Sequence, residues 1–300
     1  MPSRTQLSAR IKQAAVQAGF ELAGVAAVSR ETWRELDYFR EWIEAGYAAE
    51  MDYLKTRDPE GRLTRAAVDR AFPWARSVVV CAINYNTPAP NSTDCPNPAR
   101  GWISRYAWGG EQGPGDYHDS VLRRLRLVEE ELHRAALEAG EPLPQTRCYV
   151  DTGPIVERVA ARYAGIGWIG KNACVIHPQL GSWLFLGVVL ASLELKPDLP
   201  APDRCGTCTA CIEACPTDAL LAPYQLDAAR CISYLTIEKR GSIPEALRPG
   251  MGRHVFGCDI CQDVCPWNRR APASVQPEFQ PRTELVNPAL EWLAAMREEE

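Results

Sequence analysis

Eight of the twelve cysteines in this chain lie between residues 205 and 265, and they restrict its possible folds more than any other feature. The first run, CGTCTACIEACP at 205–216, spaces four cysteines by two, two and three residues and ends in proline. The second run, CDICQDVCP at 258–266, repeats the end of that pattern, and Cys231 precedes it. Runs of this kind are typical of domains that fold around 4Fe–4S clusters. The sequence therefore predicts two clusters in one small domain.

The spacing also predicts which cysteines share a cluster. In bacterial ferredoxins with two clusters, the fourth cysteine of a run binds the cluster of the other run. Applied here, the rule assigns four ligands to each cluster, although an insertion at 232–257 separates the first cysteine of the second run from the rest. The predicted ligands of cluster 1 are Cys205, Cys208, Cys211 and Cys265, and those of cluster 2 are Cys215, Cys231, Cys258 and Cys261.

Zinc is the main alternative for these cysteines. Four-cysteine zinc sites usually pair two CxxC units, whereas the CxxCxxCxxxCP run is the iron–sulfur signature. Iron–sulfur is therefore the favoured interpretation, and two clusters in one small fold lie close enough to exchange electrons. Outside the runs, Cys81, Cys148 and Cys174 lie in apolar, strand-like contexts and are expected to be buried bystanders.

Length and composition exclude several other classes of protein. With 46% apolar residues, the chain can bury one large core and a small second domain. It has no uninterrupted apolar run of about 18 residues, so no membrane partner is expected. Residues 1–20 lack the apolar stretch of a signal peptide, which predicts a cytoplasmic protein. The net charge of −5 argues against a broad nucleic-acid surface.

Residues 1–195 have the sequence signals of one α/β-type domain. The β-branched run RSVVVCAINY at 76–85 predicts a buried strand, and residues 119–140 predict an amphipathic helix. The proline-rich KPDLPAPD at 196–203 predicts a linker. We therefore expect three parts, namely an α/β-type domain at 1–195, a double-cluster domain at 196–275 and a C-terminal helical stub at 276–300.

Two glycine-containing stretches of the first part are unusual. SRYAWGGEQGPGDYHDSVL at 104–122 ends its glycine-rich loop in Tyr117 and His118, just before the predicted helix. In VDTGPIVERVAARYAGIGWIGKN at 150–172, Asp151 ends a strand and glycines punctuate a later tight loop. Simpler explanations are a solvent-facing helix residue for His118 and a helix cap for Asp151. The glycine density of the second stretch favours backbone that approaches a flat or bulky ligand.

Together these stretches resemble a known family of enzymes. The motifs YAWG, DYH, VDTGPIVERVAARYAGIGWIGKN, GSWLFLG, CGTCTACIEACPTDAL, RCISYLTIE and FGCDICQDVCPWNR follow one another between residues 50 and 280. In this order they are similar to epoxyqueuosine reductases, the cobalamin-dependent iron–sulfur enzymes that complete queuosine in tRNA. Family members usually continue into a C-terminal helical-repeat region that helps to hold tRNA. We expect this chain to lack most of that region.

The resemblance implies an α+β fold, in which a nitroreductase-like sandwich that binds cobalamin precedes a bacterial ferredoxin-like domain. It implies reductive deoxygenation of epoxyqueuosine to queuosine at the wobble position of a tRNA anticodon loop. The two clusters would pass electrons to cobalamin from an external donor such as a flavodoxin or a ferredoxin, while the protein supplies orientation and a proton. Because the sequence has no coiled coil or obvious dimer helix, we expect a monomer.

The resemblance also assigns roles to single residues. Asp151 matches the general acid of the family, and it must be held protonated by burial near the corrin and the substrate. Arg158 matches a substrate-contacting position, and Tyr117 and His118 are expected to line the same pocket. The positions that match cobalamin contacts are Arg62, Ser104, Asp151, Gly170, Lys171, Asn172, Val175 and Leu186.

A local basic patch is compatible with the negative total charge. Residues 230–270 contain seven Lys or Arg and four Asp or Glu, so their net charge is +7 − 4 = +3 and that of the rest is −5 − 3 = −8. This asymmetry favours a basic rim that contacts tRNA through Lys239 and Arg240. Unpaired bases of an anticodon loop would stack on Trp267 or Tyr234. The alternative is an ordinary solvated loop.

Two rival functions fit parts of the same pattern. A cobalamin-dependent reductive dehalogenase has the same cofactors, but such enzymes usually carry an export signal and use a tyrosine with a basic partner as proton source. An electron-transfer module would carry two clusters without cobalamin or substrate chemistry. Asp151 and the missing export signal weigh against the first rival, and the long domain before the cysteines weighs against the second.

Overall fold

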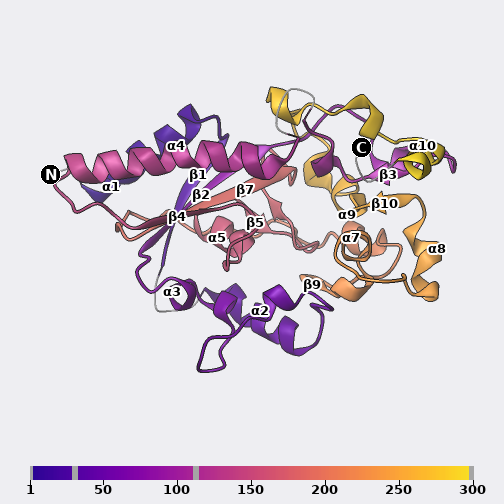
Figure 1. Cartoon of the computed structure of the whole chain (residues 1–300), viewed down its shortest axis with the longest axis horizontal. Coiled ribbons are helices and arrows are strands. Elements are labelled where there is room, and N and C mark those ends of the chain that lie inside the picture. The colour runs from indigo at the N-terminus through magenta and orange to yellow at the C-terminus, as the bar shows by residue number, and fades with distance from the viewer. Residues whose placement is uncertain (1–2, 29–32, 111–114, 297–300) are drawn as a thin grey trace.

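The structure, a computed structural model, describes residues 3–28, 33–110 and 115–296. Its centre is a four-stranded antiparallel sheet with the order β1-β2-β7-β4 (Figure 1). The strands are β1 (Leu22–Ala27), β2 (Ser77–Asn84), β4 (Thr146–Tyr149) and β7 (Leu184–Ala191).

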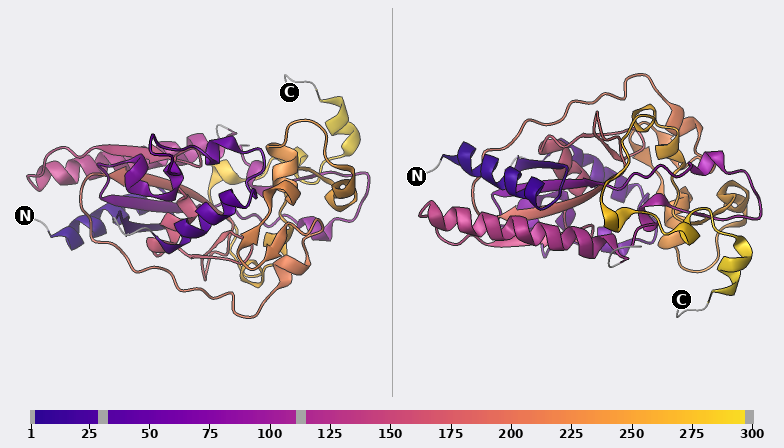
Figure 2. Two further views of the ribbon diagram at one scale, coloured as in Figure 1. Left: turned by 90° about the horizontal axis from the view of Figure 1, so that it is seen from below. Right: turned by 90° about the horizontal axis from the view of Figure 1, so that it is seen from above.

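Helices cover both faces of this sheet. One face carries two long helices that lie side by side (Figure 2), and the other carries three shorter ones. The first pair is α1 (Arg4–Gln17) and α4 (Tyr117–Glu138), and the second set is α2 (Arg34–Glu44), α3 (Val68–Ala71) and α5 (Glu157–Tyr163).

Strand β2 shows why the sequence of this part folds into a covered sheet. All of its residues are buried, and alternate residues of a strand point to opposite faces. Val79 and Ile83 belong to the apolar cluster beneath α1 and α4, whereas Val78 and Val80 belong to the cluster beneath α5. A strand covered on both sides is apolar along its whole length, so the prediction of a buried strand here is confirmed.

The long helix α4 begins two residues before the predicted start at residue 119. The carboxylate of Asp116 accepts the backbone N–H of His118 at 2.8 Å and thereby caps the helix. Tyr117 and His118 consequently form its first turn, and residues 111–114 of the preceding loop lie outside the described residues. At the other end, Gly140 has a φ of +74°, the left-handed geometry that commonly ends a helix.

Short elements build the cysteine-rich part and its surroundings. The parallel pairing of β10 with β3 joins the insertion between the cysteine runs to the N-terminal part. The described helices include none that is long and apolar enough to span a membrane. The elements are β3 (Trp102–Ile103), β5 (Trp168–Ile169), β6 (Val175–Ile176), α6 (Ala210–Glu213), β8 (Leu220–Ala222), β9 (Gln225–Leu226), α7 (Ile232–Ile237), α8 (Arg248–Met251), β10 (His254–Phe256), α9 (Ile260–Asp263) and α10 (Leu290–Ala295).

The proline-rich segment 196–203 is bound along the N-terminal part. The carboxylate of Asp198 accepts the backbone N–H of Val25 at 2.9 Å and Nζ of Lys12 at 2.8 Å. Figure 2 shows this stretch as a long trace that runs beside the sheet and its helices before it reaches the cysteine-rich part. The predicted linker is therefore held in place by hydrogen bonds at its start.

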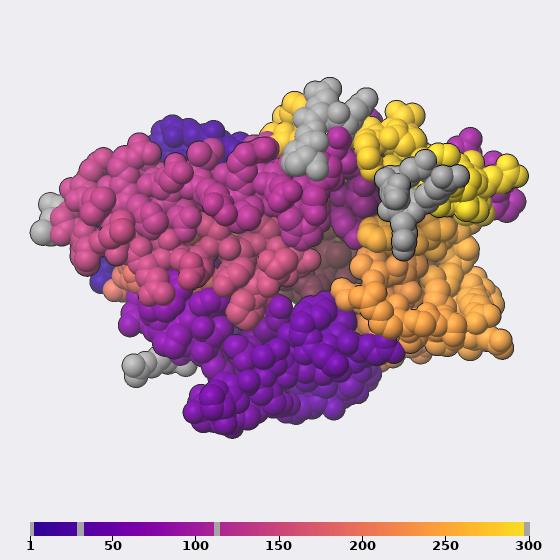
Figure 3. All heavy atoms as spheres, in the orientation of Figure 1, coloured from indigo at the N-terminus to yellow at the C-terminus, as the bar shows by residue number. Residues whose placement is uncertain are grey.

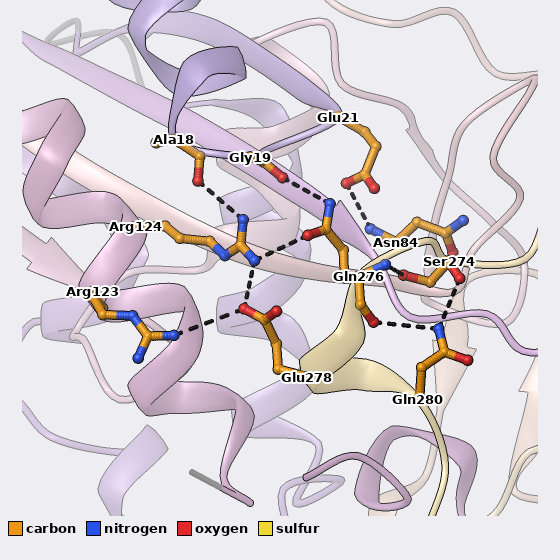
Figure 4. A network of polar contacts seen from close by, with 10 residues as sticks. All are labelled: Ala18, Gly19, Glu21, Asn84, Arg123, Arg124, Ser274, Gln276, Glu278 and Gln280. Carbon is orange, nitrogen blue, oxygen red and sulfur yellow. Dashed lines mark hydrogen bonds and ion pairs between the residues drawn. The ribbon is translucent and has the colours of Figure 1, made fainter. Parts of the chain in front are cut away.

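Residues 274–280 also return to the N-terminal part. The guanidinium of Arg124 on α4 donates to Oε1 of Gln276 at 3.0 Å and pairs with Glu278 (Figure 4). Phe279 is buried in the same apolar cluster as Phe185 of β7. Together with the bound segment 196–203, these contacts hold the cysteine-rich part at both of its ends, and the β10–β3 pairing holds it between the two cysteine runs.

Candidate functional site

Asp151 lies in the loop between β4 and α5 and has an unusual backbone conformation. Its φ is +60°, and its side chain is exposed. Aspartate tolerates this left-handed conformation better than most residues, and strained residues of this kind cluster at functional sites. The interpretation of Asp151 as a helix cap is wrong, because α5 begins only at Glu157, after Val156 at its N-cap.

Three tyrosines from separate segments lie around Asp151. Partial burial raises the pKa of Tyr53 to about 12, and the Asp151 carboxylate adds to this shift. Partial burial likewise raises the pKa of Tyr106 to about 12, again with a contribution from Asp151. The pKa of Tyr117 lies well above its ordinary value because the ring is largely buried and the Asp151 carboxylate is near. The negative charge of Asp151 therefore acts on all three phenols.

Parts of the chain that are distant in sequence meet at these tyrosines. The hydroxyl of Tyr53 donates to Glu238 at 3.2 Å, which connects the α2 region to the cysteine-rich part. Tyr117 stacks on Phe185 with ring centroids 4.2 Å apart, and Tyr106 meets Tyr117 edge-on at 6.0 Å. Figure 3 shows the surface hollowed between the α2 region, the sheet domain and the cysteine-rich part.

Tyr53 and Tyr106 are not among the residues predicted for the site. The SRYAWG stretch contains Tyr106, and its similarity to the family is the signal that could have selected it. Nothing in the sequence around Tyr53 marks it, because its role depends on how the α2 region folds back toward Asp151.

Glu157 is a largely buried carboxyl group beside Asp151. Its Oε1 atom has no hydrogen-bond partner within the described ranges. Burial, and after it the Asp151 carboxylate, raise the pKa of Glu157 to about 7 against the opposing charge of Arg65. A carboxyl group that titrates near neutral pH next to an exposed carboxylate is typical of functional sites. No role for Glu157 is predicted from the sequence.

We expect the substitution Glu157→Gln to stabilise the protein more at pH 8 than at pH 5. The pKa of Glu157 is raised in the folded state, so stability falls as the pH rises from the ordinary pKa of 4.5 through about 7. Glutamine keeps the size of the side chain and cannot ionise, which removes a penalty of at most about 3 kcal/mol at the higher pH. Thermal unfolding of both proteins at the two pH values measures this difference. An equal change at both pH values would contradict it.

The predicted substrate-contacting residues lie at the edge of this space. The side chain of Arg158 is exposed, and its Nη1 donates to the carbonyl of Ala173 at 2.7 Å. Nδ1 of His118 lies 2.7 Å from Oδ1 of Asp116, with the ring 35% exposed. Both residues are therefore held in place by the chain, and both keep polar atoms at the surface.

The positions that match cobalamin contacts are not all brought together. Val175 and Leu186 pack in the apolar cluster on the α5 face of the sheet. Arg62, by contrast, is 57% exposed, and its Nε pairs with Asp58 at 2.8 Å. The hydroxyl of Ser104 is buried and donates its hydrogen to a carboxylate of the second cysteine run, so this donor is already used within the protein.

That carboxylate, Asp259, connects the two parts of the molecule. It is 2% exposed and lies between two cysteines of the second run. Its oxygens accept the backbone N–H of Arg105 at 2.7 Å, the indole N–H of Trp102 at 3.0 Å and the Ser104 hydroxyl. Because a carboxylate with three donors is well satisfied despite its burial, this network fixes the second run against β3.

The glycines before Asn172 serve the packing of the chain itself. A side chain at Gly167 would place its Cβ 2.4 Å from the carbonyl oxygen of Ile176, and one at Gly170 would lie 2.7 Å from Oδ1 of Asn172. These contacts arise within the antiparallel pair of strands β5 and β6, called here the β5–β6 ribbon. The expectation that the glycines make room for a bulky ligand is therefore not needed to explain these two positions.

Lys171 and Asn172 contact the cysteine runs directly. Nζ of Lys171 donates to the carbonyl oxygens of Gly206 and Cys208 at 2.7 and 2.8 Å. Nδ2 of Asn172 donates to the carbonyl of Cys261 at 3.2 Å. The ribbon end thus contacts one run through the lysine and the other through the asparagine.

Cys265 of the second run packs in one apolar cluster with Cys205 of the first run. Burial raises the pKa of Cys265 to about 11, with contributions from the thiols of Cys205 and Cys211. Burial also raises the pKa of Cys211, with contributions from Cys205 and Cys208. Cys265, which belongs to the second run, thus lies with the first three cysteines of the first run.

The four predicted ligands of cluster 2 form a separate group. Burial raises the pKa of Cys258, with contributions from the thiols of Cys231 and Cys215. The thiol of Cys261 lies near those of Cys258 and Cys231. In the described part of the chain, no three His, Cys, Asp or Glu side chains are arranged to hold a single metal ion.

Cys174 differs from the other cysteines outside the runs. Cys81 is buried within β2, and Cys148 packs against the same core, as expected of bystanders. The thiol of Cys174, however, contacts that of Cys261 at the edge of the second group. Cys174 lies just before β6 rather than within a strand, and its role as a bystander stays a prediction.

Comparison with known proteins identifies the family. A profile described as epoxyqueuosine reductase QueG, DUF1730 matches residues 65–152, and one described as a 4Fe-4S double cluster binding domain matches residues 204–268. The epoxyqueuosine reductase of Synechocystis sp. is 43% identical over 92% of this chain and 90% of its own length. The chain belongs to the epoxyqueuosine reductase family. The double-cluster profile confirms the iron–sulfur interpretation over zinc.

Solved epoxyqueuosine reductases have the same mixed helix and sheet fold. A crystal structure of epoxyqueuosine reductase with a tRNA-Tyr epoxyqueuosine-modified tRNA stem loop has a TM-score of 0.83 at 32% identity, over 99% of this chain and 75% of that one. The Bacillus subtilis enzyme, in a structure with an aspartate catalytic loop swung out of the active site, has a TM-score of 0.82 at 31% identity, over 99% of this chain and 74% of that one. A catabolic reductive dehalogenase shares only the fold, with a TM-score of 0.53 at 16% identity over 92% of this chain and 33% of that one.

Within this epoxyqueuosine reductase family member, the predicted basic rim is partly neutralised. Nζ of Lys239 pairs with Glu50 at 2.8 Å, while the Arg240 side chain is exposed. Tyr234 is only 5% exposed, so the prediction that it stacks on bases is wrong. Trp267 is half-buried and packs edge-on against another tryptophan beside the cluster ligands.

Proposed function

We propose that this protein reductively deoxygenates epoxyqueuosine to queuosine at the wobble position of tRNA. The proposal is carried by the chain's membership of the epoxyqueuosine reductase family, with a double-cluster domain at 204–268 and an Asp151 carboxylate that acts on three tyrosines. Conversion of an epoxide to an alkene takes up two electrons and two protons and releases water. The site therefore needs an electron supply and a proton donor side by side.

Four further assignments belong to this proposal. The thiols of Cys205, Cys208, Cys211 and Cys265 hold cluster 1, and those of Cys215, Cys231, Cys258 and Cys261 hold cluster 2. The chain divides into a nitroreductase-like domain at 1–195, a double-cluster domain at 196–275 and a C-terminal helical stub at 276–300. Electrons enter from an external donor such as a flavodoxin or a ferredoxin, and the protein acts as a monomer.

Residues near Asp151 would hold cobalamin. The hollow of Figure 3 lies between the sheet domain and the cysteine-rich part, and the unpartnered buried Oε1 of Glu157 is an acceptor that a corrin amide can satisfy. Val175, Leu186 and the turn at 170–172 would contact the ring, whereas Arg62 would first have to leave Asp58. When bound, cobalamin supplies the strongly reducing cobalt centre that the chemistry needs.

The chain's own residues supply the proton and the orientation. Asp151 donates a proton to the departing epoxide oxygen, and its exposed side chain becomes enclosed only when cofactor and substrate are in place. Tyr117 and His118 line the pocket, and the exposed guanidinium of Arg158 binds a substrate hydroxyl or a neighbouring phosphate. Lys239 and Arg240 contact the anticodon loop from the rim.

A direct assay tests this function. The reconstituted protein, with cobalamin and a reductant, is incubated with an epoxyqueuosine-containing tRNA stem loop, and the nucleoside is analysed by mass spectrometry. We expect the loss of one oxygen atom from the modified base. Halide release from an aryl halide without deoxygenation would favour the dehalogenase alternative. If the protein does not retain cobalamin through gel filtration, both enzyme functions are excluded and the electron-transfer module remains.

A further inference from the structure

Lys171 is a buried cation at the loop that carries the cluster 1 ligands. It follows β5 and is 8% exposed. Its ammonium group donates to the carbonyl oxygens of Gly206 and Cys208, within the CGTC segment that begins the first cysteine run. Two of its three hydrogen-bond donors are therefore directed at backbone that surrounds cluster 1.

No carboxylate balances this charge in the described part of the chain. Among the described residues Lys171 forms no ion pair, whereas Lys12 pairs with Asp198 and Lys239 pairs with Glu50. Burial of an ammonium group without an opposite charge is costly, and two neutral carbonyl oxygens compensate only part of that cost. A negative charge that completes the pair is thus expected close to Lys171.

Cluster 1 supplies such a charge. An oxidised 4Fe–4S core carries two positive charges and its four thiolates carry four negative ones, so the bound cluster is a dianion that becomes a trianion on reduction. We propose that Lys171 is the counter-ion of cluster 1 and raises its reduction potential by stabilising the reduced form. The inference rests on the proposed binding of the clusters and goes beyond it.

The two clusters differ in this respect. At cluster 2 the neighbouring residue Asn172 offers a neutral amide to the carbonyl of Cys261. Arg105 is buried beside Asp259, but the carboxylates of Asp259 and Asp263 oppose its charge. Arg230 donates to the carbonyl of Thr217 at 3.0 Å but also faces Asp218 at 3.5 Å and is more exposed than Lys171. Lys171 therefore makes cluster 1 the better electron acceptor of the pair, because its charge is less screened by water.

Redox titration followed by electron paramagnetic resonance tests this assignment. In Lys171→Gln, which keeps hydrogen-bond donors but removes the charge, we expect the reduced-to-oxidised ratio of cluster 1 at a fixed potential to fall about tenfold, equivalent to about 59 mV for one electron. The potential of cluster 2 should change much less. Lys171→Arg should retain the wild-type potential, and Lys12→Gln is the control for removal of a paired lysine charge.

The titration needs no tRNA, so its outcome is separable from the proposed function. Unchanged cluster 1 potential in a Lys171→Gln protein that holds both clusters would overturn the counter-ion role alone. Wild-type protein that binds no clusters would overturn the proposed function as well. If Lys171→Gln does not assemble cluster 1, iron and sulfide are measured in Lys171→Met and Lys171→Arg. Assembly in the arginine variant alone supports the charge, and failure in both shows that lysine acts only through its shape.

Discussion

Replacement of Asp151 by asparagine is expected to lower the rate of epoxyqueuosine deoxygenation by about 10²- to 10⁴-fold, the usual contribution of a general acid. Asparagine has the same size and also tolerates the left-handed backbone with a φ of +60°. The loop between β4 and α5 should therefore keep its conformation, and only the donated proton is lost. Single-turnover assays on the tRNA stem loop measure the effect.

Two accompanying measurements make the Asp151→Asn result specific. Cluster absorbance should equal that of the wild type, because the substitution changes no cluster ligand. Cobalamin absorbance is measured as well, because Asp151 also matches a cobalamin contact, and the rate is compared at equal cobalamin content. Asp52→Asn is the matched control, since Asp52 is exposed, precedes Tyr53 and, among the residues that the structure describes, forms an ion pair with Lys55 alone. A wild-type rate in an Asp151→Asn protein that holds all its cofactors would exclude Asp151 as the proton donor.

The second large effect is expected from Cys215→Ala, which should remove cluster 2 and leave cluster 1. Cys215 is the fourth cysteine of the first run, yet its thiol lies with those of Cys231 and Cys258. The variant should retain about half of its iron and lose deoxygenation, because electrons can no longer pass through both clusters. Iron analysis and paramagnetic resonance of the reduced protein measure the remaining cluster.

A comparison among variants distinguishes crossed ligation from ligation run by run. With crossed ligation, Cys215→Ala and Cys261→Ala leave the same resonance signal, and Cys211→Ala leaves the other one. If each run held its own cluster, Cys215→Ala and Cys211→Ala would instead leave the same signal. These variants also assign the two signals that the Lys171 titration requires.

Much of the fold could be predicted because its signals are local. The apolar run of β2 predicts a strand covered on both faces. The apolar periodicity of α4 predicts a helix whose first residue differs by two from the observed one. The cysteine spacing predicts two groups of four thiols, because three cysteines close together in the sequence can bind the same 4Fe–4S cluster and the fourth ligand comes from the other run.

Other expectations failed where the answer depends on distant segments. Tyr234 resembles an exposed stacking residue in sequence, but it is buried beneath the α2 region, with its hydroxyl bonded to the backbone of Glu50. Cys174 looks like a strand residue, but the β5–β6 ribbon places its thiol at Cys261. Neither neighbour is close in the chain, so no local pattern could reveal it.

The sequence by itself determined the chemistry of this protein: the residue types and spacings that bind clusters, the family, and Asp151 as the candidate acid. Tertiary structure decided which groups act on one another. It placed Tyr53, Tyr106 and Glu157 around Asp151, and it buried Lys171 against the first cysteine run. The reason is physical, because spacing along the chain fixes short-range ligation, whereas burial and charge pairing depend on packing between segments that can be more than a hundred residues apart.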